Sequence, residues 1–349
     1  MATAACIYVA AAGYFGRQDA GKVGVFRRAP NVGAWQHVLP DVDAYALLVH
    51  PTEPELVFAG TADGVWCSTD RGATFRRTAF PDRGKQVWSL LLDARNPRCL
   101  YAGSSPVDVY RSDDGGASWR CLPNPGIAAR ATAPFPVRVM RMVQHPTRPQ
   151  EIYAALEVNG VMRTRDGGES WSDCSADLIR LSEQPHLRSK IVSDTHAEGM
   201  LDGHAIAISA AAPEAVILAC RMGLFRSTDQ GQSWRPMDLK GVSPFSYGRD
   251  VRAAPEDGAT VYAALSVAAA SKDGALYRSR DAGDSWQRCD KVAVHGTIMS
   301  IGLHASDPRQ IYIAARYDGE VFGTEDGGET WAALPLPPPV KDLYAVACG

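Results

Sequence analysis

The segment "SDTHAEGMLDGH" at residues 193–204 concentrates side chains that can move a proton or bind a metal ion. Within it, His196 and Glu198 are separated by one residue, as are Asp202 and His204. An imidazole beside a carboxylate can act as a general acid or base near neutral pH, and the same groups can ligate a divalent metal ion. The spacing matches no zinc signature. We therefore expect His204 or His196 to be the catalytic acid or base, and we keep a metal site of His196, Glu198 and His204 as the alternative.

Four arginines occupy positions that suit the binding of an anion. Arg221 in "ACRMG" and Arg316 in "AARYDG" directly follow strand-like segments, and Arg138 and Arg249 directly precede others. A guanidinium group donates paired hydrogen bonds in one plane, so several around one opening would hold a carboxylate or phosphate. The alternative is that they pair with nearby aspartates and only hold loops together. We predict a small anionic substrate, bound also by Tyr45, Trp88 and His295, with Tyr317 as a further catalytic residue.

Because these side chains are far apart in the sequence, a repeated architecture has to bring them together. An eight-residue pattern recurs six times: Ser/Thr, any, Asp, any, Gly, any, Ser/Thr, Trp/Phe, as in "SDDGGASW" at 112–119. Successive copies are 44 to 63 residues apart, which is typical of the blades of a propeller. The six aspartates are Asp70, Asp114, Asp166, Asp229, Asp281 and Asp326.

This octapeptide resembles the Asp-box of the BNR-repeat proteins, which include sialidases, sortilin-like receptors, xyloglucanases and photosystem assembly factors. The resemblance implies that each box is a turn between the two outer strands of a blade, and that the six aspartates are structural. The residue chemistry agrees, because a short carboxylate accepts backbone hydrogen bonds and glycine adopts the positive φ of a tight turn. The resemblance does not extend to sialidase activity: "FRRAP" at 26–30 is the nearest string to the expected Arg-Ile-Pro motif and lacks that order. We therefore exclude a sialidase.

Short strand-like segments around the boxes predict seven blades. A segment such as "LVFAG" precedes each box, and a seventh copy, "CIYVA", precedes a decayed box in which Pro30 replaces the aspartate. Inner strands such as "YALLVHP" recur six times, and "DLYAVAC" at 342–348 has the same character. We predict an all-β fold, a seven-bladed β-propeller of four-stranded antiparallel blades over residues 1–349, with the C-terminal strand joining the N-terminal blade to close the ring.

The longest gap between boxes, 63 residues from Asp166 to Asp229, contains an insertion at about residues 172–204. Insertions on a rigid scaffold are where functional residues concentrate. This insertion includes His196 and His204, so we expect it to be a functional loop.

Composition narrows the classes of function. The net charge of −3 and the pI of about 6.2 give no electrostatic reason to expect nucleic-acid binding. The sequence has no apolar run of about 18 residues, and no Lys or Arg precedes Arg17, so we expect neither a membrane span nor a secretory signal. Its eight cysteines form no Cys-x-x-Cys pair, so we expect reduced thiols and a cytoplasmic location.

Three functions remain open. The first is a hydrolase- or lyase-type enzyme acting on a small anionic molecule at the mouth of the propeller channel. The second is a scaffold that binds or assembles proteins, and the third is a glycan-binding or glycan-cleaving protein with a carboxylate pair from Asp43, Asp63 and Asp108. An enclosed polar pocket with a buried histidine would favour the enzyme, and a broad apolar surface would favour the scaffold. The presumed loops carry no apolar run, so we predict the enzyme.

Overall fold

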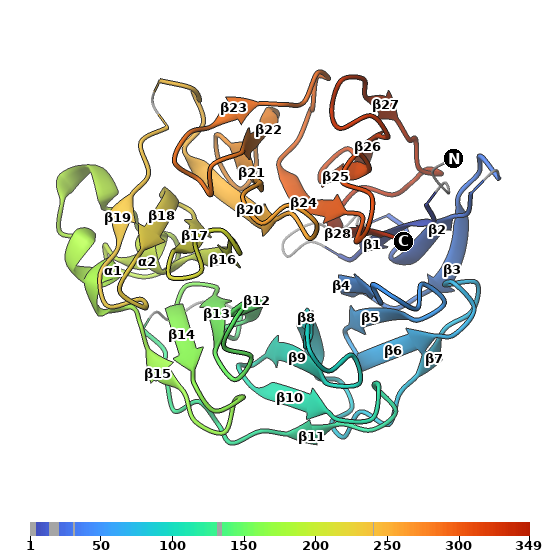
Figure 1. Cartoon of the computed structure of the whole chain (residues 1–349), viewed down its shortest axis with the longest axis horizontal. Helices are drawn as coiled ribbons and strands as arrows, with labels where there is room; N and C mark the ends of the chain where they lie inside the picture. The colour runs from blue at the N-terminus through green and yellow to red at the C-terminus, as the bar shows by residue number, and fades with distance from the viewer. Residues whose placement is uncertain (1–4, 14–20, 31, 131–134, 240) are drawn as a thin grey trace.

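Seven sheets of four antiparallel strands surround a central axis in the computed structural model (Figure 1). The structure describes residues 5–13, 21–30, 32–130, 135–239 and 241–349. Blade 1 has the strand order β28-β1-β2-β3, and blades 2 to 7 take four consecutive strands each, from β4–β7 to β24–β27. The predicted seven-bladed propeller is confirmed.

Each blade contributes one strand to each of four concentric layers. The inner strands are β28 (Leu343–Cys348), β4 (Ala44–Val49), β8 (Gln86–Leu92), β12 (Val139–Gln144), β16 (Gly203–Ile208), β20 (Tyr247–Ala253) and β24 (Ile298–Leu303). The second strands are β1 (Ile7–Ala11), β5 (Val57–Thr61), β9 (Leu100–Ser105), β13 (Ile152–Leu156), β17 (Val216–Cys220), β21 (Val261–Ser266) and β25 (Ile311–Ala315). The third strands are β2 (Gly24–Arg28), β6 (Gly64–Ser68), β10 (Val109–Ser112), β14 (Gly160–Thr164), β18 (Gly223–Ser227), β22 (Gly274–Ser279) and β26 (Glu320–Thr324). The outer strands are β3 (Gln36–Pro40), β7 (Arg76–Arg77), β11 (Arg120–Cys121), β15 (Ser172–Asp173), β19 (Arg235–Pro236), β23 (Gln287–Arg288) and β27 (Ala332–Ala333).

The ring closes where the two ends of the chain pair in blade 1. Strand β28 runs antiparallel to β1, with Ile7 opposite Cys348. The backbone N–H of Cys6 donates to the carbonyl of Gly349 at 2.9 Å, and the reverse bond measures 3.1 Å. This pairing gives β1 a partner on both sides, so β1 is not left as a free sheet edge. The predicted closure by the C-terminal strand is confirmed.

The recurring octapeptide forms a compact turn between the third and fourth strands of blades 2 to 7, which we call the aspartate turn. In blade 3, Asp114 Oδ1 accepts the N–H of Ser118 at 2.9 Å and the hydroxyl of Ser112 at 2.8 Å. The Ser112 hydroxyl oxygen in turn accepts the N–H of Gly116 at 2.8 Å. Hydrogen bonds from Ser118 lower the pKa of Asp114 to about 2. The other five aspartates accept the same set of bonds.

The aspartate turns also join neighbouring blades. Gly116 has φ +86°, and a Cβ there would lie 2.6 Å from the ring of Phe58 in blade 2. The position therefore requires glycine both for its backbone angle and for the close approach. In blade 5, Trp234 is 1% exposed and its indole N–H donates to the carbonyl of Cys174 in blade 4 at 3.0 Å. Each turn thus adds buried apolar contact between adjacent sheets.

The insertion between β15 and β16 contains the helices of the described chain: α1 (Ala176–Leu181), the 3-10 helix η1 (Pro185–Leu187) and α2 (Glu198–Leu201). Leu178, Leu181 and Met200 pack into the core between blades 4 and 5, beside which the helices lie in Figure 1. In the described ranges, none of these helices has the length and apolar character needed to cross a bilayer.

Candidate functional site

Every blade has a β-bulge near the start of its inner strand. In blade 5, Gly203 pairs with Cys220 and Ala205 pairs with Ala219, which leaves His204 between the two paired positions. The inner strands of the other six blades skip one residue at the same place. A bulge redirects a side chain away from the regular alternation of a strand. The skipped residues form a bulge ring around the axis: Tyr344, Tyr45, Trp88, Met140, His204, Arg249 and Met299.

A cavity of about 440 Å³ is lined by residues of the bulge ring. Its volume is within the range of small-molecule binding sites. Its polar wall comes from the loops before the inner strands and after the second strands, and includes Asp43, Gln86, Arg138, Glu157, Asp202, Arg221 and Arg316. Ile191 of the insertion also lines it. On the side of the bulge ring where Arg141 lies, the channel narrows to a space of about 20 Å³. The guanidinium of Arg141 in blade 4 reaches Asp250 in blade 6, at 3.4 Å.

The side chain of His204 is buried at the centre of a hydrogen-bond network. Its Nδ1 lies 2.7 Å from the carbonyl oxygen of Gly248, and because a carbonyl can only accept, Nδ1 carries a proton. The other ring nitrogen, Nε2, lies 3.2 Å from the hydroxyl of Tyr247 and 3.2 Å from Oδ2 of Asp202. Neutral His204 can therefore accept from Tyr247, and protonated His204 can donate to Asp202. This arrangement lets the imidazole gain or lose a proton without changing its position.

The carboxyl group of Asp202 stays ionised despite its burial. Desolvation acts to raise its pKa, but the charges of His204, Arg221 and Arg249 outweigh this effect, so the pKa lies below its ordinary value. Desolvation raises the pKa of Tyr247, whose phenol therefore remains protonated at neutral pH. The site thus combines an ionised carboxylate, an imidazole with a protonated Nδ1 and a neutral phenol.

The four arginines that line the cavity differ in the partners that the protein provides for their guanidinium groups. Arg138 is held by Glu157 at 2.6 Å, and its guanidinium lies over the ring of Trp88 at 4.2 Å. Arg316 donates to the carbonyl of Ala269 at 3.3 Å. Arg249 contacts the sulfur of Met299 through Nε at 3.2 Å.

Within the described chain, neither Arg221 nor Arg249 forms an ion pair with a carboxylate. The cavity wall contains four guanidinium groups and three carboxylates, Asp43, Glu157 and Asp202. An anion entering the cavity would meet at least two guanidinium groups that form no direct ion pair with a carboxylate of the described chain.

Seven of the ten residues predicted for catalysis or substrate binding line the cavity: Arg138, Arg221, Arg249, Arg316, Tyr45, Trp88 and His204. The other three lie outside its wall. His196 is exposed. Tyr317 donates its hydroxyl proton to the carbonyl of Ala269 at 2.7 Å, behind Arg316. His295 is 65% exposed and its Nδ1 pairs with Glu320 at 2.9 Å.

The structure does not bring His196, Glu198 and His204 together as metal ligands. The carboxylate of Glu198 accepts the backbone N–H groups of Ile191, Val192 and Ser193, and so fixes the loop that reaches the cavity. Among the residues with described positions, no group of three or more His, Cys, Asp or Glu side chains could hold a metal ion. The ligand set fails because α2 directs Glu198 towards the insertion itself, whereas the bulge directs His204 towards the axis.

The carboxylates predicted for a glycan-cleaving site are also separated. Asp63 pairs with Arg77 at 2.9 Å, and Asp108 pairs with Lys85 at 2.6 Å. Of the three, Asp43 lines the cavity, where its Oδ1 accepts the N–H of Gly13 at 2.8 Å.

Sequence reasoning missed several cavity residues, among them Tyr247, Phe135, Met140 and Tyr344. Tyr247 was missed because the inner strand of blade 6 was expected to begin at residue 250, whereas β20 begins at Tyr247. A signal did exist for the bulge ring: aligning the inner strands places Tyr45, Trp88, Met140 and Tyr344 in one column of large side chains.

The fold and the site define a class: a seven-bladed β-propeller with a polar cavity on its axis. No protein-family model matches the chain. In sequence it is similar to a xyloglucanase from a Paenibacillus species, with 26% identity over 290 residues, which cover 70% of this chain and 26% of the xyloglucanase. The chain thus spans about a quarter of the length of the curated relative that it matches.

Two solved structures share the fold at low sequence identity. A crystal structure of an ancestral GH74 enzyme matches with a TM-score of 0.56 and 13% identity, over 88% of this chain and 38% of that one. YCF48 from Cyanidioschyzon merolae matches with a TM-score of 0.54 and 14% identity, over 86% of both chains.

Proposed function

We propose that this protein is an enzyme of the hydrolase or lyase type that binds a small anionic substrate in the axial cavity. The observation that carries the proposal is the placement of Asp202, His204 and Tyr247 beside Arg221 and Arg249, in one polar cavity. A buried histidine with a fixed tautomer is suited to general acid-base catalysis, and unpaired guanidinium groups are suited to a carboxylate or phosphate. The six aspartate turns and the likeness to a xyloglucanase support membership of the Asp-box superfamily and a carbohydrate-related substrate.

Calorimetric titration of the purified protein with D-glucuronate, succinate and inorganic phosphate tests the binding step. We expect saturable binding of at least one anion, and an affinity about 10- to 100-fold lower for Arg249→Met, since a hydrogen bond to a charged group contributes about 1.5–3 kcal/mol. D-glucose is the neutral control for D-glucuronate. The absence of saturable binding to all three anions would contradict the proposal.

A second candidate is a protein-binding scaffold, favoured by the likeness to YCF48 over most of both chains. An apolar groove of about 370 Å³ beside blade 5 offers a surface for it, with Leu187, Met222 and Phe245 among its lining residues. Under this candidate, Phe245→Ser abolishes the cellular function and Arg249→Met does not. The enzyme hypothesis predicts the opposite result, so complementation of a deletion strain by the two variants separates the candidates.

A further inference from the structure

The bulge ring presents two different surfaces to a ligand. Blades 1 to 3 supply an aromatic half, in which Tyr45 stacks on Trp88 at 4.0 Å and the edge of Tyr344 contacts both rings. Blades 5 and 6 supply a polar half with His204 and Arg249. Because Tyr45 and Trp88 cover each other and Arg138 lies over Trp88, the aromatic half offers mainly ring edges to a ligand. A pyranose ring has a matching two-sided character, because its C–H groups pack against apolar ring surface while its polar substituents form hydrogen bonds. The cavity therefore suits a sugar.

The polar half adds a requirement for negative charge on that sugar. Arg221 and Arg249 both face the cavity without a carboxylate partner in the described chain. The nearby carboxylate of Asp202 lies 3.2 Å from Nε2 of His204, where it can stabilise the imidazolium, and it forms no direct ion pair with either arginine in the described chain. A carboxylate on the ligand would supply the missing partner for the two guanidinium groups. A sugar that carries a carboxylate is a uronic acid.

Building on the proposed function, we propose that the cavity binds a uronic-acid residue of an oligosaccharide and cleaves the bond at its C4 oxygen by β-elimination. Arg221 and Arg249 hold the carboxylate, and Tyr247 exchanges the protons with His204 behind it. The hydrogen on C5 is acidic because it lies next to the carboxylate. Two guanidinium groups increase this acidity by stabilising the negative charge that develops on the carboxylate oxygens in the transition state.

The elimination balances without water or an oxidant. The Tyr247 oxygen takes the C5 proton as its own proton passes to Nε2 of His204, whose positive charge is then stabilised by Asp202 at 3.2 Å. The C5–H electron pair forms the C4=C5 double bond, and the C4–O bond breaks. Tyr247 then protonates the departing oxygen and regains a proton from His204. One proton has moved from C5 to the leaving oxygen, and the enzyme is unchanged.

The cavity favours elimination over glycoside hydrolysis, which requires a pair of free carboxyl groups. Each carboxylate on the cavity wall already accepts a bond from the protein: Asp43 from Gly13, Glu157 from Arg138, and Asp202 from His204 when the imidazole is protonated. By contrast, Tyr247 and the two arginines remain available to a ligand.

The arrangement also selects the configuration at C4. Because Tyr247 both removes and returns the proton, the C5 hydrogen and the C4 oxygen must lie on the same side of the sugar. They do so in glucuronate, where the C4 oxygen is equatorial. In galacturonate the axial C4 oxygen lies opposite the C5 hydrogen. We therefore expect cleavage next to glucuronate and not next to galacturonate.

The test is incubation of the purified chain with hyaluronan, in which glucuronate is substituted at C4, and with carboxyl-reduced hyaluronan, polygalacturonate and xyloglucan as controls. Elimination produces a double bond conjugated to the carboxylate, which absorbs in the ultraviolet, and a fragment that is one water lighter by mass spectrometry than a hydrolytic fragment. We expect this product from hyaluronan, and from none of the three controls.

Two variants test the assigned roles. We expect Tyr247→Phe and His204→Gln each to lower kcat at least about 100-fold, the usual size of a proton-transfer contribution. Tyr277→Phe is the matched control. Tyr277 lies in β22, next but one to β20 along the same sheet, and its buried hydroxyl has no hydrogen-bond partner in the described chain, so this variant should retain full activity. Thermal unfolding of each variant verifies that the fold is intact.

The possible failures of this inference and of the proposed function are distinguishable. New reducing ends from hyaluronan without ultraviolet absorbance would overturn the elimination and retain a hydrolase. The absence of any cleavage of hyaluronan would overturn the inference, and the titration with D-glucuronate, succinate and phosphate would then decide the proposed function separately. An unsaturated product from polygalacturonate but not from hyaluronan would overturn the assignment of both proton transfers to Tyr247.

Discussion

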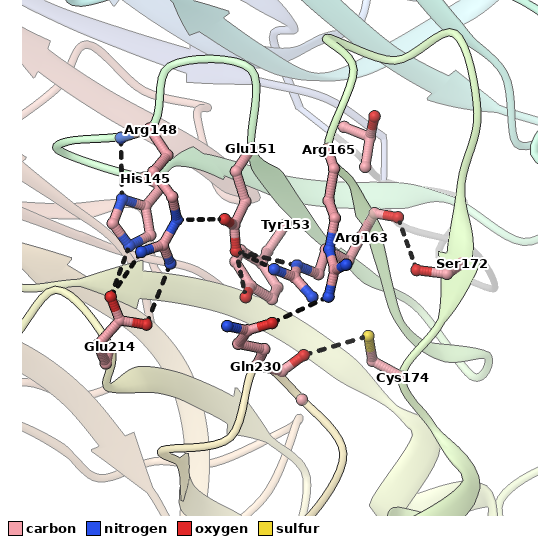
Figure 2. Close-up of polar contacts among 12 residues, drawn as sticks. His145, Arg148, Glu151, Tyr153, Arg163, Arg165, Ser172, Cys174, Glu214 and Gln230 are labelled. Carbon is pink, nitrogen blue, oxygen red and sulfur yellow. Dashed lines mark hydrogen bonds and ion pairs between the residues drawn. The ribbon is translucent and has the colours of Figure 1, made fainter.

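Two arginine-rich regions lie at opposite ends of blade 4 and use the same side chain differently. At the start of β12, the axial cavity gathers guanidinium groups of which Arg221 and Arg249 have no carboxylate partner in the described chain. Beyond the end of β12 lies a second group, which we call the rim ion-pair network (Figure 2). It consists of Arg148, Glu151, Arg163 and Glu214.

Every charged group of the rim ion-pair network is paired. Arg163 Nη2 lies 2.7 Å from Glu151 Oε1, and both side chains are 5% exposed. Arg148 bridges Glu151 at 2.6 Å and Glu214 at 2.5 Å, which joins blade 4 to blade 5 (Figure 2). Burial acts to raise the pKa of Glu151, but hydrogen bonds from Arg148, Tyr153 and Arg163 lower it to about 2. The contrast is between paired arginines that join blades 4 and 5 and axial arginines that form no ion pair in the described chain, for which we propose a ligand-binding role.

The largest effect on stability is expected at the centre of the rim network. Glu151→Ala leaves the buried guanidinium of Arg163 without its partner, so we expect a loss of about 3–5 kcal/mol in the free energy of unfolding, measured by urea denaturation. Glu169→Ala is the control, because it breaks an exposed pair with Arg120 and should cost less than about 1 kcal/mol. Equal stabilities of the two variants would remove the structural role assigned to the network.

Replacing an arginine at the axis should change the free energy of unfolding in the opposite direction. Arg249→Met removes a buried cation that forms no ion pair with a carboxylate in the described chain, and the methionine can pack against Met299. We expect the variant to be about 0.5–2 kcal/mol more stable than the parent, as is common when a functional group that strains the fold is replaced. A destabilisation as large as that of Glu151→Ala would mean that Arg249 is structural, and the comparison between the two regions would fail.

A smaller effect is expected at an aspartate turn. Asp114→Ala removes the acceptor for three donor groups within the turn of blade 3, and we expect a loss of about 1–2 kcal/mol. The neighbouring Asp113→Ala, which loses an exposed pair with Arg111, should change stability by less than about 0.5 kcal/mol. Comparable losses in the two variants would mean that the turn bonds add little to the fold.

The smallest effect concerns pH. Burial lowers the pKa of His145 below 6.5. Its Nδ1 accepts the backbone N–H of Thr147 and that of Arg148, the latter shown in Figure 2, as the neutral form must. The unfolded chain therefore binds a proton near pH 6.5 while the folded chain does not. This contribution to stability is complete above pH 6.5 and decreases as the pH falls below it towards the lowered pKa.

His145→Asn keeps an acceptor and removes the titration, so we expect a flatter stability profile between about pH 7 and 5 than in the parent, by less than about 1 kcal/mol. Urea denaturation at several pH values measures this difference. Superimposable profiles for the two proteins would mean that His145 has the same proton affinity in both states.

The sequence was sufficient to predict the propeller because turn chemistry repeats in it at blade length. It also predicted the arginines of the cavity, since Arg221 and Arg316 follow equivalent strands. It did not predict the bulges themselves, because a bulge depends on the register between two strands. Their trace in the sequence was the aligned column of Tyr45, Trp88, Met140 and Tyr344. His196 and His295 were expected at the site from their positions in the chain, but one lies on the exposed part of the insertion and the other pairs with Glu320.

The closure of blade 1 has a consequence for biosynthesis. Strand β28 is synthesised after the other described strands, so β1, β2 and β3 lack their inner partner while the six intervening blades are being made. Until β28 arrives, β1 offers a free edge to other chains and the axis lacks Tyr344. The nascent chain is therefore most open to association during this interval, and the axial cavity is complete only once the last inner strand has docked.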